Sequence, residues 1–183
     1  MDQNAYIDTH RNVVEACKRG ERSAQFELYR LYSKAMYNTC LRMLRHENDA
    51  EDALQNAFID IFGKIESFMF QSSVGAWMKR IVVNNCINFM QRQKVVFTEF
   101  EAETHLTNKS TEDEAVPETL LSVDSIKKAM TQLSEGYRVV FSLYMIEGYD
   151  HEEIAEILRI SESTSKSQLS RAKQKVRDLI KAN

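Results

Sequence analysis

The chain has 183 residues, of which 43% are hydrophobic and 28% are charged, and its 24 basic and 27 acidic side chains give a net charge of −3. This composition is typical of a folded globular protein and excludes a disordered polar chain. One proline and five glycines are too few for a turn-rich β protein, and no apolar run reaches the roughly 20 residues that a membrane span needs. We therefore predict an all-α protein without membrane insertion.

The sequence shows no pattern for a metal centre, a cofactor or a catalytic site. Cys17, Cys40 and Cys86 lie far apart in apolar helical contexts, and the four histidines are scattered. Such cysteines indicate buried thiols in a reducing compartment, and the polar N-terminus is not a secretory signal. We expect a cytoplasmic protein that binds no cofactor or metal and is not an enzyme.

Apolar residues at steps of three and four predict three helices in the first part of the chain, over residues 6–19, 22–44 and 48–65. In the second helix, the side chains expected to face the core are Phe26, Tyr29, Tyr32, Met36, Cys40 and Met43. Asn48 is the expected N-cap of the third helix, with Glu51 three residues later. The inward positions of that helix are Ala50, Leu54, Ala57, Phe58, Ile61 and Ile65.

The outer face of the third helix is acidic, and no Lys or Arg lies between Glu47 and Ile61. Carboxylates in a first turn stabilise a helix by ~0.3–1 kcal/mol each through its dipole, which accounts for Asp49 and Asp52. A docking face for a basic partner would also explain why the polar surface continues through Gln55. The residues alone leave both interpretations open.

Residues 67–75 are predicted to form a loop, and a helix is predicted over residues 76–94. The loop holds three consecutive large apolar residues, Phe68, Met69 and Phe70, which cannot all face inward. The inward positions expected in the helix are Met78, Ile81, Val82, Asn85, Cys86 and Phe89. A second face carries Arg80, Asn84 and Asn88, and such amides flanked by cations suit base edges and phosphates. An exposed polar helix face is the alternative interpretation.

Helical periodicity lapses after this helix. Residues 97–118 contain seven acidic residues, one lysine and the only proline of the chain. This pattern predicts an acidic, flexible linker over residues 96–121, between helical domains at 1–95 and 122–183.

The second predicted domain starts with helices over residues 124–133 and 134–147, the latter ended by Gly148. Their expected inward positions are Val123, Ile126, Ala129, Met130 and Leu133, then Tyr137, Val140, Phe141, Tyr144 and Met145. A helical hairpin over residues 150–181 follows. Asp150 and Glu153 form the pattern of a capping box, and Ser161 is the expected N-cap of the last helix. That helix should bury Leu169, Ala172, Val176 and Leu179.

The last helix of this hairpin is basic. Residues 159–183 carry seven basic and two acidic side chains within a chain of net charge −3. Two short helices with a basic, polar second member are typical of a helix-turn-helix, whose second helix can enter a DNA major groove. The alternative is a helical hairpin with a solvated basic face.

Three segments, in this order along the chain, resemble the extracytoplasmic-function (ECF) sigma factors, the two-domain class of bacterial sigma subunits. They are NDAEDALQNAFIDIF at residues 48–62, SSVGAWMKRIVVNN at 72–85 and EGYDHEEIAEILRISESTSKSQLSRAKQKV at 147–176. The resemblance implies a non-catalytic subunit that binds core RNA polymerase through its β′ clamp and β subunits. Such a subunit recognises and melts promoter DNA, and it is associated with the nucleoid when bound to polymerase.

The resemblance also implies roles for individual residues. Those matching the polymerase-docking segment are Asp49, Asp52, Gln55 and Phe58. Those matching the minus-10 reading loop and helix are Phe68, Phe70, Gln71, Ser72, Ser73, Arg80, Asn84 and Asn88. Those matching the minus-35 recognition helix are Ser163, Thr164, Lys166, Ser167, Ser170, Arg171 and Lys173. Of these, Lys173 is expected to contact a DNA phosphate. Trp77 falls at a buried aromatic position, and Ser165 replaces a core-facing Val or Ile.

Two other functions are compatible with the residues. A stand-alone helix-turn-helix regulator would need a symmetric dimer interface, but the sequence offers no spare apolar stripe for one, so we expect a monomer. A helical adaptor that has lost DNA binding is the other alternative. The family resemblance further implies an anti-sigma factor as a partner that holds the protein inactive.

Overall fold

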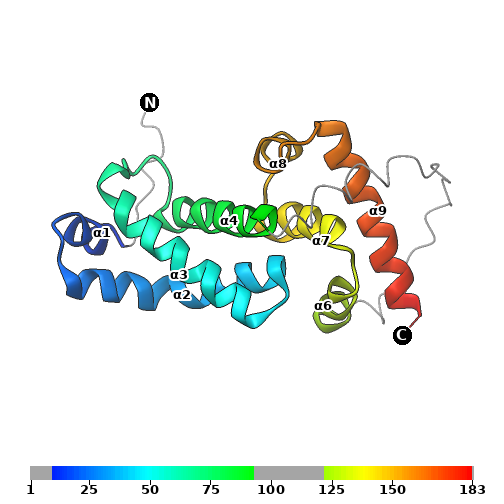
Figure 1. The fold of residues 1–183 in the computed structure, drawn as a ribbon, viewed down its shortest axis with the longest axis horizontal. Coiled ribbons are helices and arrows are strands. Elements are labelled where there is room, and N and C mark those ends of the chain that lie inside the picture. The colour runs from blue at the N-terminus through cyan, green and yellow to red at the C-terminus, as the bar shows by residue number, and fades with distance from the viewer. Residues whose placement is uncertain (1–9, 93–121, 183) are drawn as a thin grey trace, which may run out of the picture. The chain divides into compact units, whose positions relative to one another are not determined.

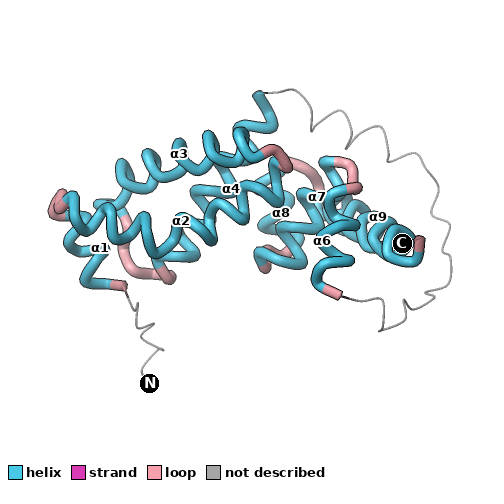
Figure 2. The backbone as a smooth tube through the Cα atoms, turned by 90° about the horizontal axis from the view of Figure 1, so that it is seen from below, coloured by secondary structure: helices cyan, strands magenta, loops and turns pink. Residues whose placement is uncertain are grey.

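The computed structural model describes residues 10–92 and 122–182, which lie in two compact units, residues 1–89 and 90–183 (Figure 1). Every regular element among the described residues is a helix, and within each unit short loops join one helix to the next (Figure 2). The all-α prediction is therefore confirmed. The predicted linker, residues 96–121, lies outside the described residues.

The first unit contains α1 (Arg11–Lys18), α2 (Arg22–Leu44), α3 (Glu47–Lys64), the short 3-10 helix η1 (Ile65–Ser67) and α4 (Val74–Arg92). The bounds of α2 are those predicted. The predicted first helix reached back to residue 6, and residues 1–9 lie outside the described part. The N-cap of α3 is His46, not Asn48, and its side chain makes no capping bond.

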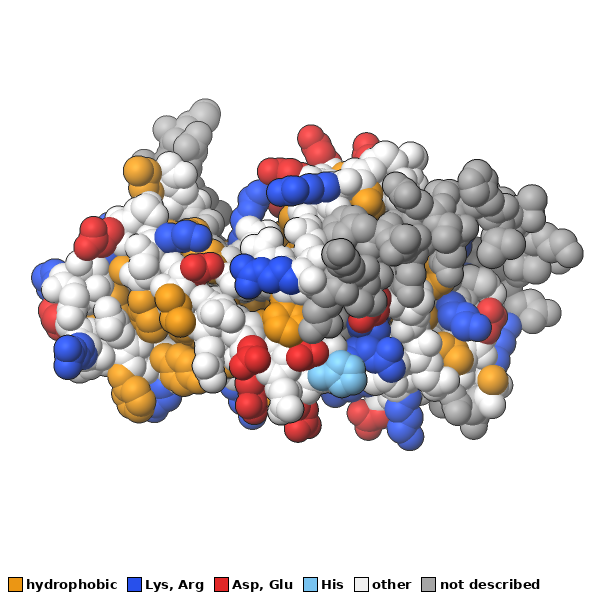
Figure 3. All heavy atoms as spheres, in the orientation of Figure 1, with side chains coloured by type: hydrophobic (Ala, Val, Ile, Leu, Met, Phe, Trp, Pro, Cys, Tyr) orange, Lys and Arg blue, Asp and Glu red, His pale blue; other side chains and the backbone are white. Residues whose placement is uncertain are grey.

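Helix α2 packs against both α1 and α3, and this decides which of its residues are buried. Leu28, Met36, Cys40 and Met43 are buried, as is the whole predicted inward face of α3. The prediction for Phe26 and Tyr29 was wrong, since they are 68% and 41% exposed. Leu28 faces the neighbouring helices. Phe26 and Tyr29 lie on other sides of the same helix and therefore point outward. Figure 3 shows hydrophobic side chains gathered on the surface over α2 and α3.

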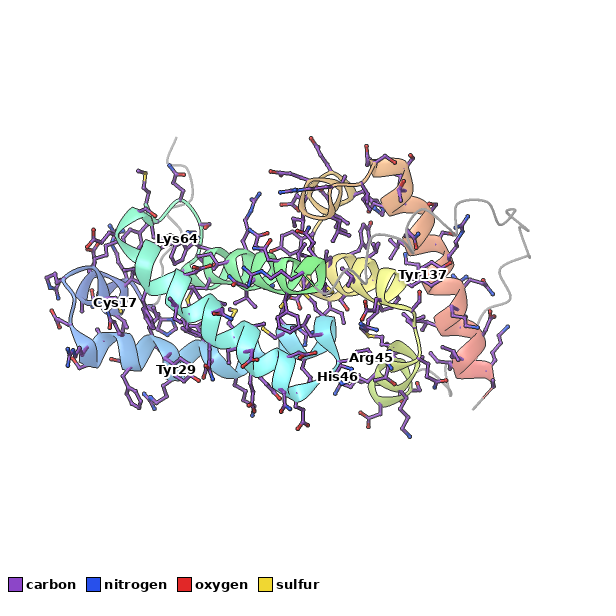
Figure 4. All side chains as sticks on the ribbon, in the orientation of Figure 1. Cys17, Tyr29, Arg45, His46, Lys64 and Tyr137 are labelled. Carbon is purple, nitrogen blue, oxygen red and sulfur yellow. The ribbon has the colours of Figure 1, made fainter. Side chains whose placement is uncertain are left out.

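The helix ends of the first unit follow from local backbone geometry. The Arg45 N–H makes the last helical bond of α2, to the carbonyl of Leu41 at 2.9 Å, and the φ of 70° at Arg45 ends the helix. Arg45 and His46 form the turn into α3 (Figure 4). Helix α4 buries Met78, Val82 and Cys86 as predicted, whereas Ile81, Asn85 and Phe89 are half-buried.

The second unit contains α6 (Val123–Thr131), α7 (Glu135–Ser142), the π-helical turn η4 (Leu143–Glu147), α8 (His151–Leu158) and α9 (Glu162–Lys181). Helices α6, α7 and α8 all pack on α9. Gly148 ends η4 with φ 82°, the left-handed conformation predicted for it.

Two predicted core positions of the second unit, Val123 and Met145, were wrong, and Ile126, Tyr137, Tyr144 and Leu179 are half-buried. Val123 is 68% exposed because it is the first residue of α6 and precedes the packed turns. Met145 is 50% exposed because the π-helical turn adds a residue per turn and rotates the following side chains out of phase. In the last turn of α9, Ile180 is buried and Leu179 is half-buried, so the apolar stripe is one residue further along.

The cysteines are buried, as predicted: Cys17 is 2% exposed, and Cys40 and Cys86 are fully buried. Burial first, and then the carboxylates of Glu21 and Glu27, raise the pKa of the Cys17 thiol above its ordinary value. A raised pKa lowers the thiolate fraction at neutral pH, and the thiolate is the reactive form. No helix in residues 10–92 or 122–182 combines the length and hydropathy of a membrane span.

Candidate functional site

Local hydrogen bonds build the helical hairpin of α8 and α9 as its sequence predicted. The Asp150 carboxylate accepts from the Glu153 N–H at 2.8 Å, and the Glu153 carboxylate accepts from the Asp150 N–H at 3.0 Å. Arg159 ends α8 in the left-handed conformation, with φ 57°. The hydroxyl of Ser161 accepts from the Thr164 N–H at 3.0 Å and caps α9. These caps fix the turn that holds the two helices against one another.

The seven residues predicted at the minus-35 element all lie on α9, between its second residue and its middle. Exposed among them are Ser163, Lys166 and Ser170, and half-buried are Thr164, Ser167, Arg171 and Lys173. The Lys166 ammonium lies 2.7 Å from the Glu162 carboxylate. The Ser167 hydroxyl donates to the Thr164 carbonyl at 3.0 Å. This half of α9 therefore presents hydroxyls and cations at its surface.

The inner side of the same half of α9 is polar as well. Ser165 is fully buried, as its core-facing position predicted, and its hydroxyl lies 2.9 Å from Nδ1 of His151 on α8. The His151 ring stacks on Tyr144, with centroids 4.6 Å apart, and the Lys173 ammonium lies 5.6 Å from the Tyr144 ring centre. A hydrogen bond and ring stacking thus replace the apolar contact that a Val or Ile would make.

The acidic face of α3 is solvent-accessible. Glu51, Asp52 and Gln55 are exposed and Asp49 is half-buried. Burial first, and then the carboxylates of Glu47 and Glu51, raise the pKa of the nearby Tyr37 hydroxyl on α2. Glu47, Asp49, Glu51 and Asp52 place four carboxylates at the N-terminal end of this face.

Phe58, which was also assigned to the docking face, is a core residue. It is 4% exposed and packs against Tyr29 and Phe62, with ring centroids 4.7 and 5.8 Å away. Ile59, next to it in sequence, is 69% exposed and was missed. A motif match identifies a residue's position in the chain but not its solvent exposure. Helix α3 packs on one side only, so the adjacent residues Phe58 and Ile59 differ in exposure.

The loop between η1 and α4 buries only one of its three consecutive apolar side chains. Phe68 is 3% exposed and lies 4.9 Å from the Phe70 ring and 5.0 Å from the half-buried Trp77 ring, between centroids. Phe68 therefore belongs to the core, which corrects its assignment to a DNA-reading surface. Met69, by contrast, is 75% exposed and was given no DNA-binding role from the sequence. Gln71 and Ser72 are exposed.

Helix α4 starts directly after this loop and presents its predicted polar face to solvent. The Ser73 hydroxyl accepts from the Ala76 N–H at 3.1 Å, which caps the helix. Arg80, Asn84 and Asn88 are exposed on successive turns. Asn85 points the other way, and its amide donates to the Asp60 carboxylate at 2.9 Å, which fixes α4 to α3. The loop and this polar face are therefore carried by one well-anchored helix.

Two family models match the chain. The model described as Sigma-70 region 2 matches residues 28–95, and the model described as Sigma-70, region 4 matches residues 124–176. The first range contains the acidic face, the loop and the polar face of α4, and the second contains the capped helical hairpin.

Several relatives match along most of the chain. The RNA polymerase sigma factor YlaC of Bacillus subtilis (strain 168) is 31% identical over 152 residues, which cover 80% of this chain and 86% of the relative. The ECF RNA polymerase sigma factor SigW of the same strain is 28% identical over 178 residues, covering 92% of this chain and 95% of the relative.

Two solved structures have the same fold. The sigma factor RpoE of Bartonella quintana, in complex with the anti-sigma factor NepR, matches with a TM-score of 0.56 and 24% identity over 86% of this chain and 96% of that one. CnrH, in complex with the cytosolic domain of CnrY, matches with a TM-score of 0.57 and 20% identity over 96% of this chain and 99% of that one. The two family models and the relatives show that the chain belongs to the ECF family of RNA polymerase sigma factors.

Proposed function

We propose that this chain binds core RNA polymerase and directs it to promoters through three surfaces, acting by binding rather than by catalysis. The observation that carries the proposal is that one chain combines an acidic docking face on α3 with two separate polar or basic faces, on α4 and α9. A stand-alone regulator would need the DNA-binding hairpin but not the acidic face. We assign residues 1–95 and 122–183 to two domains that act on the same promoter.

The polymerase-docking surface is the exposed face of α3, formed by Asp49, Asp52 and Gln55 with the newly identified Ile59. An exposed apolar side chain beside carboxylates suits a partner helix that is basic at one end and apolar along its side. The basic partner surface is expected on the β′ clamp of the polymerase. Helix-dipole stabilisation remains a second role for Asp49, since it lies in the first turn of α3.

The minus-10 surface consists of the loop after η1 and the polar face of α4. Extruding a base from the duplex costs a few kcal/mol of stacking and pairing. A surface that binds only the extruded base offsets this cost, so strand opening becomes dependent on sequence. Gln71 and Ser72 would contact that base, with Phe70 and Ser73 supporting the loop. The exposed side chains of Arg80, Asn84 and Asn88 would follow the melted strand.

The minus-35 surface is the first half of α9, which would lie in the major groove of the DNA. Exposed hydroxyls such as Ser163 and Ser170 can donate to or accept from base edges, and Arg171 can bind a guanine through two hydrogen bonds. Lys173 is assigned to a phosphate. Because polymerase holds both surfaces on one promoter, two modest contacts multiply in their effect on affinity.

In-vitro transcription with bacterial core polymerase on genomic fragments tests the proposal. Start sites that appear only when the protein is added are the expected result, and their aligned upstream sequences would give both promoter elements. Failure of the protein to bind core polymerase, combined with tight binding to DNA alone, would instead establish a stand-alone regulator. We also propose that the protein acts in the cytoplasm, at the nucleoid when it is bound to polymerase.

An anti-sigma factor is a further proposed partner, by family resemblance. It would act by covering the docking face of α3 or the first half of α9. Adding such a partner to the transcription assay should suppress the sigma-dependent transcripts, and raising the polymerase concentration should restore them if both partners compete for α3.

A further inference from the structure

The loop between η1 and α4 holds an unusual backbone conformation. Phe70 has φ 57°, in the left-handed region that large aromatic residues rarely adopt. A conformation of this kind persists only when the surrounding contacts impose it. Within the loop, the Phe70 ring contacts the Phe68 ring, with centroids 4.9 Å apart, whereas Ser73 caps α4 and Met69 and Gln71 face solvent.

Two cations of α1 add contacts to Phe70 from outside the loop. The Arg11 guanidinium lies 4.4 Å from the Phe70 ring centre, and the Lys18 ammonium lies 4.7 Å from the same ring centre. Both distances are within the range of cation–π attraction. The Lys18 ammonium also donates a hydrogen bond to the backbone carbonyl of Phe68. One helix therefore contacts the loop at both its backbone and its aromatic side chain.

The spacing of these residues explains how they reach one ring. Arg11 and Lys18 are seven residues apart, close to two turns of helix, so they lie on the same face of α1. Helix α1 also packs directly against η1, which precedes the loop. The Glu15 carboxylate between them lies 3.9 Å from Arg11 and moderates the repulsion of two cations at one site.

The consequence is a defined outward presentation of the loop. With Phe68 in the core and Phe70 held against α1, Met69 between them is 75% exposed and Gln71 after them is exposed. Resting on the function proposed above, we propose that Arg11 and Lys18 are positioning residues for base recognition at the minus-10 element. They act through the loop, and minus-10 discrimination depends on α1 although α1 does not read the base itself.

The experiment compares the wild-type chain with Arg11→Ala/Lys18→Ala. A control, Arg19→Ala/Arg22→Ala, removes two charges from the adjoining turn without touching the loop; Arg19 pairs with Glu21 there, at 2.8 Å. A conservative variant, Arg11→Lys/Lys18→Arg, keeps both cations. Arg11→Gln alone keeps the Lys18 hydrogen bond and serves if the double variant unfolds. Thermal melts of all variants establish that they are folded.

The first readout is acrylamide quenching of the only tryptophan, Trp77, whose ring lies 5.0 Å from Phe68. Quenching should increase in Arg11→Ala/Lys18→Ala and stay at the wild-type level in the charge control. The second readout is transcription by the holoenzyme from templates with single-base changes at either promoter element. The ratio of transcription from correct and altered minus-10 templates should fall about tenfold, with the minus-35 ratio unchanged and the conservative variant restoring discrimination.

Each remaining outcome contradicts the proposal in a distinct way. Unchanged quenching and discrimination would show that the loop holds its conformation without α1. An equal loss of transcription on every template would make Arg11 and Lys18 phosphate contacts rather than positioning residues. If the wild-type chain itself gives no transcript with core polymerase, the proposed function is wrong, and this inference, which rests on it, is wrong as well.

Discussion

At the scale of single residues, a buried amide on α9 stands out. Gln168 is 1% exposed, and its Oε1 finds no hydrogen-bond donor within the described part of the chain. A buried acceptor without a partner costs about 1–3 kcal/mol. We expect Gln168→Met, which keeps the shape and removes the polar group, to raise the free energy of unfolding by about 1 kcal/mol in urea denaturation.

A second glutamine on the same helix provides the control for Gln168. Gln174 donates to the Asp178 carboxylate at 3.0 Å, so Gln174→Met should give no gain in stability. If Gln168→Met lowered the free energy of unfolding instead, a bound water would be the partner that satisfies its oxygen.

Asp52 provides the residue-scale test of polymerase docking. It is exposed in the middle of the acidic face of α3, so reversing its charge should leave the fold intact and repel a basic partner. We expect Asp52→Lys to weaken binding to core polymerase at least about tenfold, measured by fluorescence anisotropy of labelled protein. Glu27→Lys makes the same charge reversal at an exposed position of α2, off this face, and should bind as the wild type does. Equal binding by both variants would remove α3 from the docking surface.

At the scale of the elements, α9 divides into a reading half and a packing half. Arg171 is half-buried on the proposed reading side, and Lys173, two residues later, is the residue assigned to a phosphate. We expect Arg171→Ala to cost about 1–3 kcal/mol at one base position of the minus-35 element and to relax the preference there. Lys173→Ala should weaken binding uniformly and reduce its salt dependence. Equilibrium binding of holoenzyme to a panel of minus-35 variants at two salt concentrations distinguishes the two behaviours.

The elements also show what the sequence can and cannot predict. The N-terminal ends of α8 and α9 were predictable because the capping residues Asp150, Glu153 and Ser161 form hydrogen bonds with partners three residues away. The exposure of Phe26 was not predictable, since periodicity gives a stripe but not which neighbours cover it. Met145 was missed because a single π-helical turn shifts the phase of every residue after it.

The candidate site was predictable to a similar degree. Motif matches located the acidic face of α3, the loop and the recognition helix, but they could not show that Phe58 and Phe68 are core residues. The contact of Arg11 with Phe70 joins residues far apart in sequence, and neither residue carries a local signal for the other. Such contacts arise only from the packing of α1 beside η1.

At the scale of the whole molecule, the two DNA-reading faces belong to different compact units. Nearly all of α4 lies in the first unit, and α9 lies in the second. If polymerase alone couples them, the free-energy costs of damaging each face should add. We expect the loss of transcription in Asn84→Ala/Arg171→Ala to be the product of the two single losses, with a coupling free energy within about 0.5 kcal/mol of zero. A double-mutant cycle on one promoter measures this term, with Asn84→Ala/Lys173→Ala as the cycle that involves only a phosphate contact on α9. A coupling free energy well above that limit would mean that the two units communicate when bound, so that promoter recognition would depend on their arrangement as well as on each face.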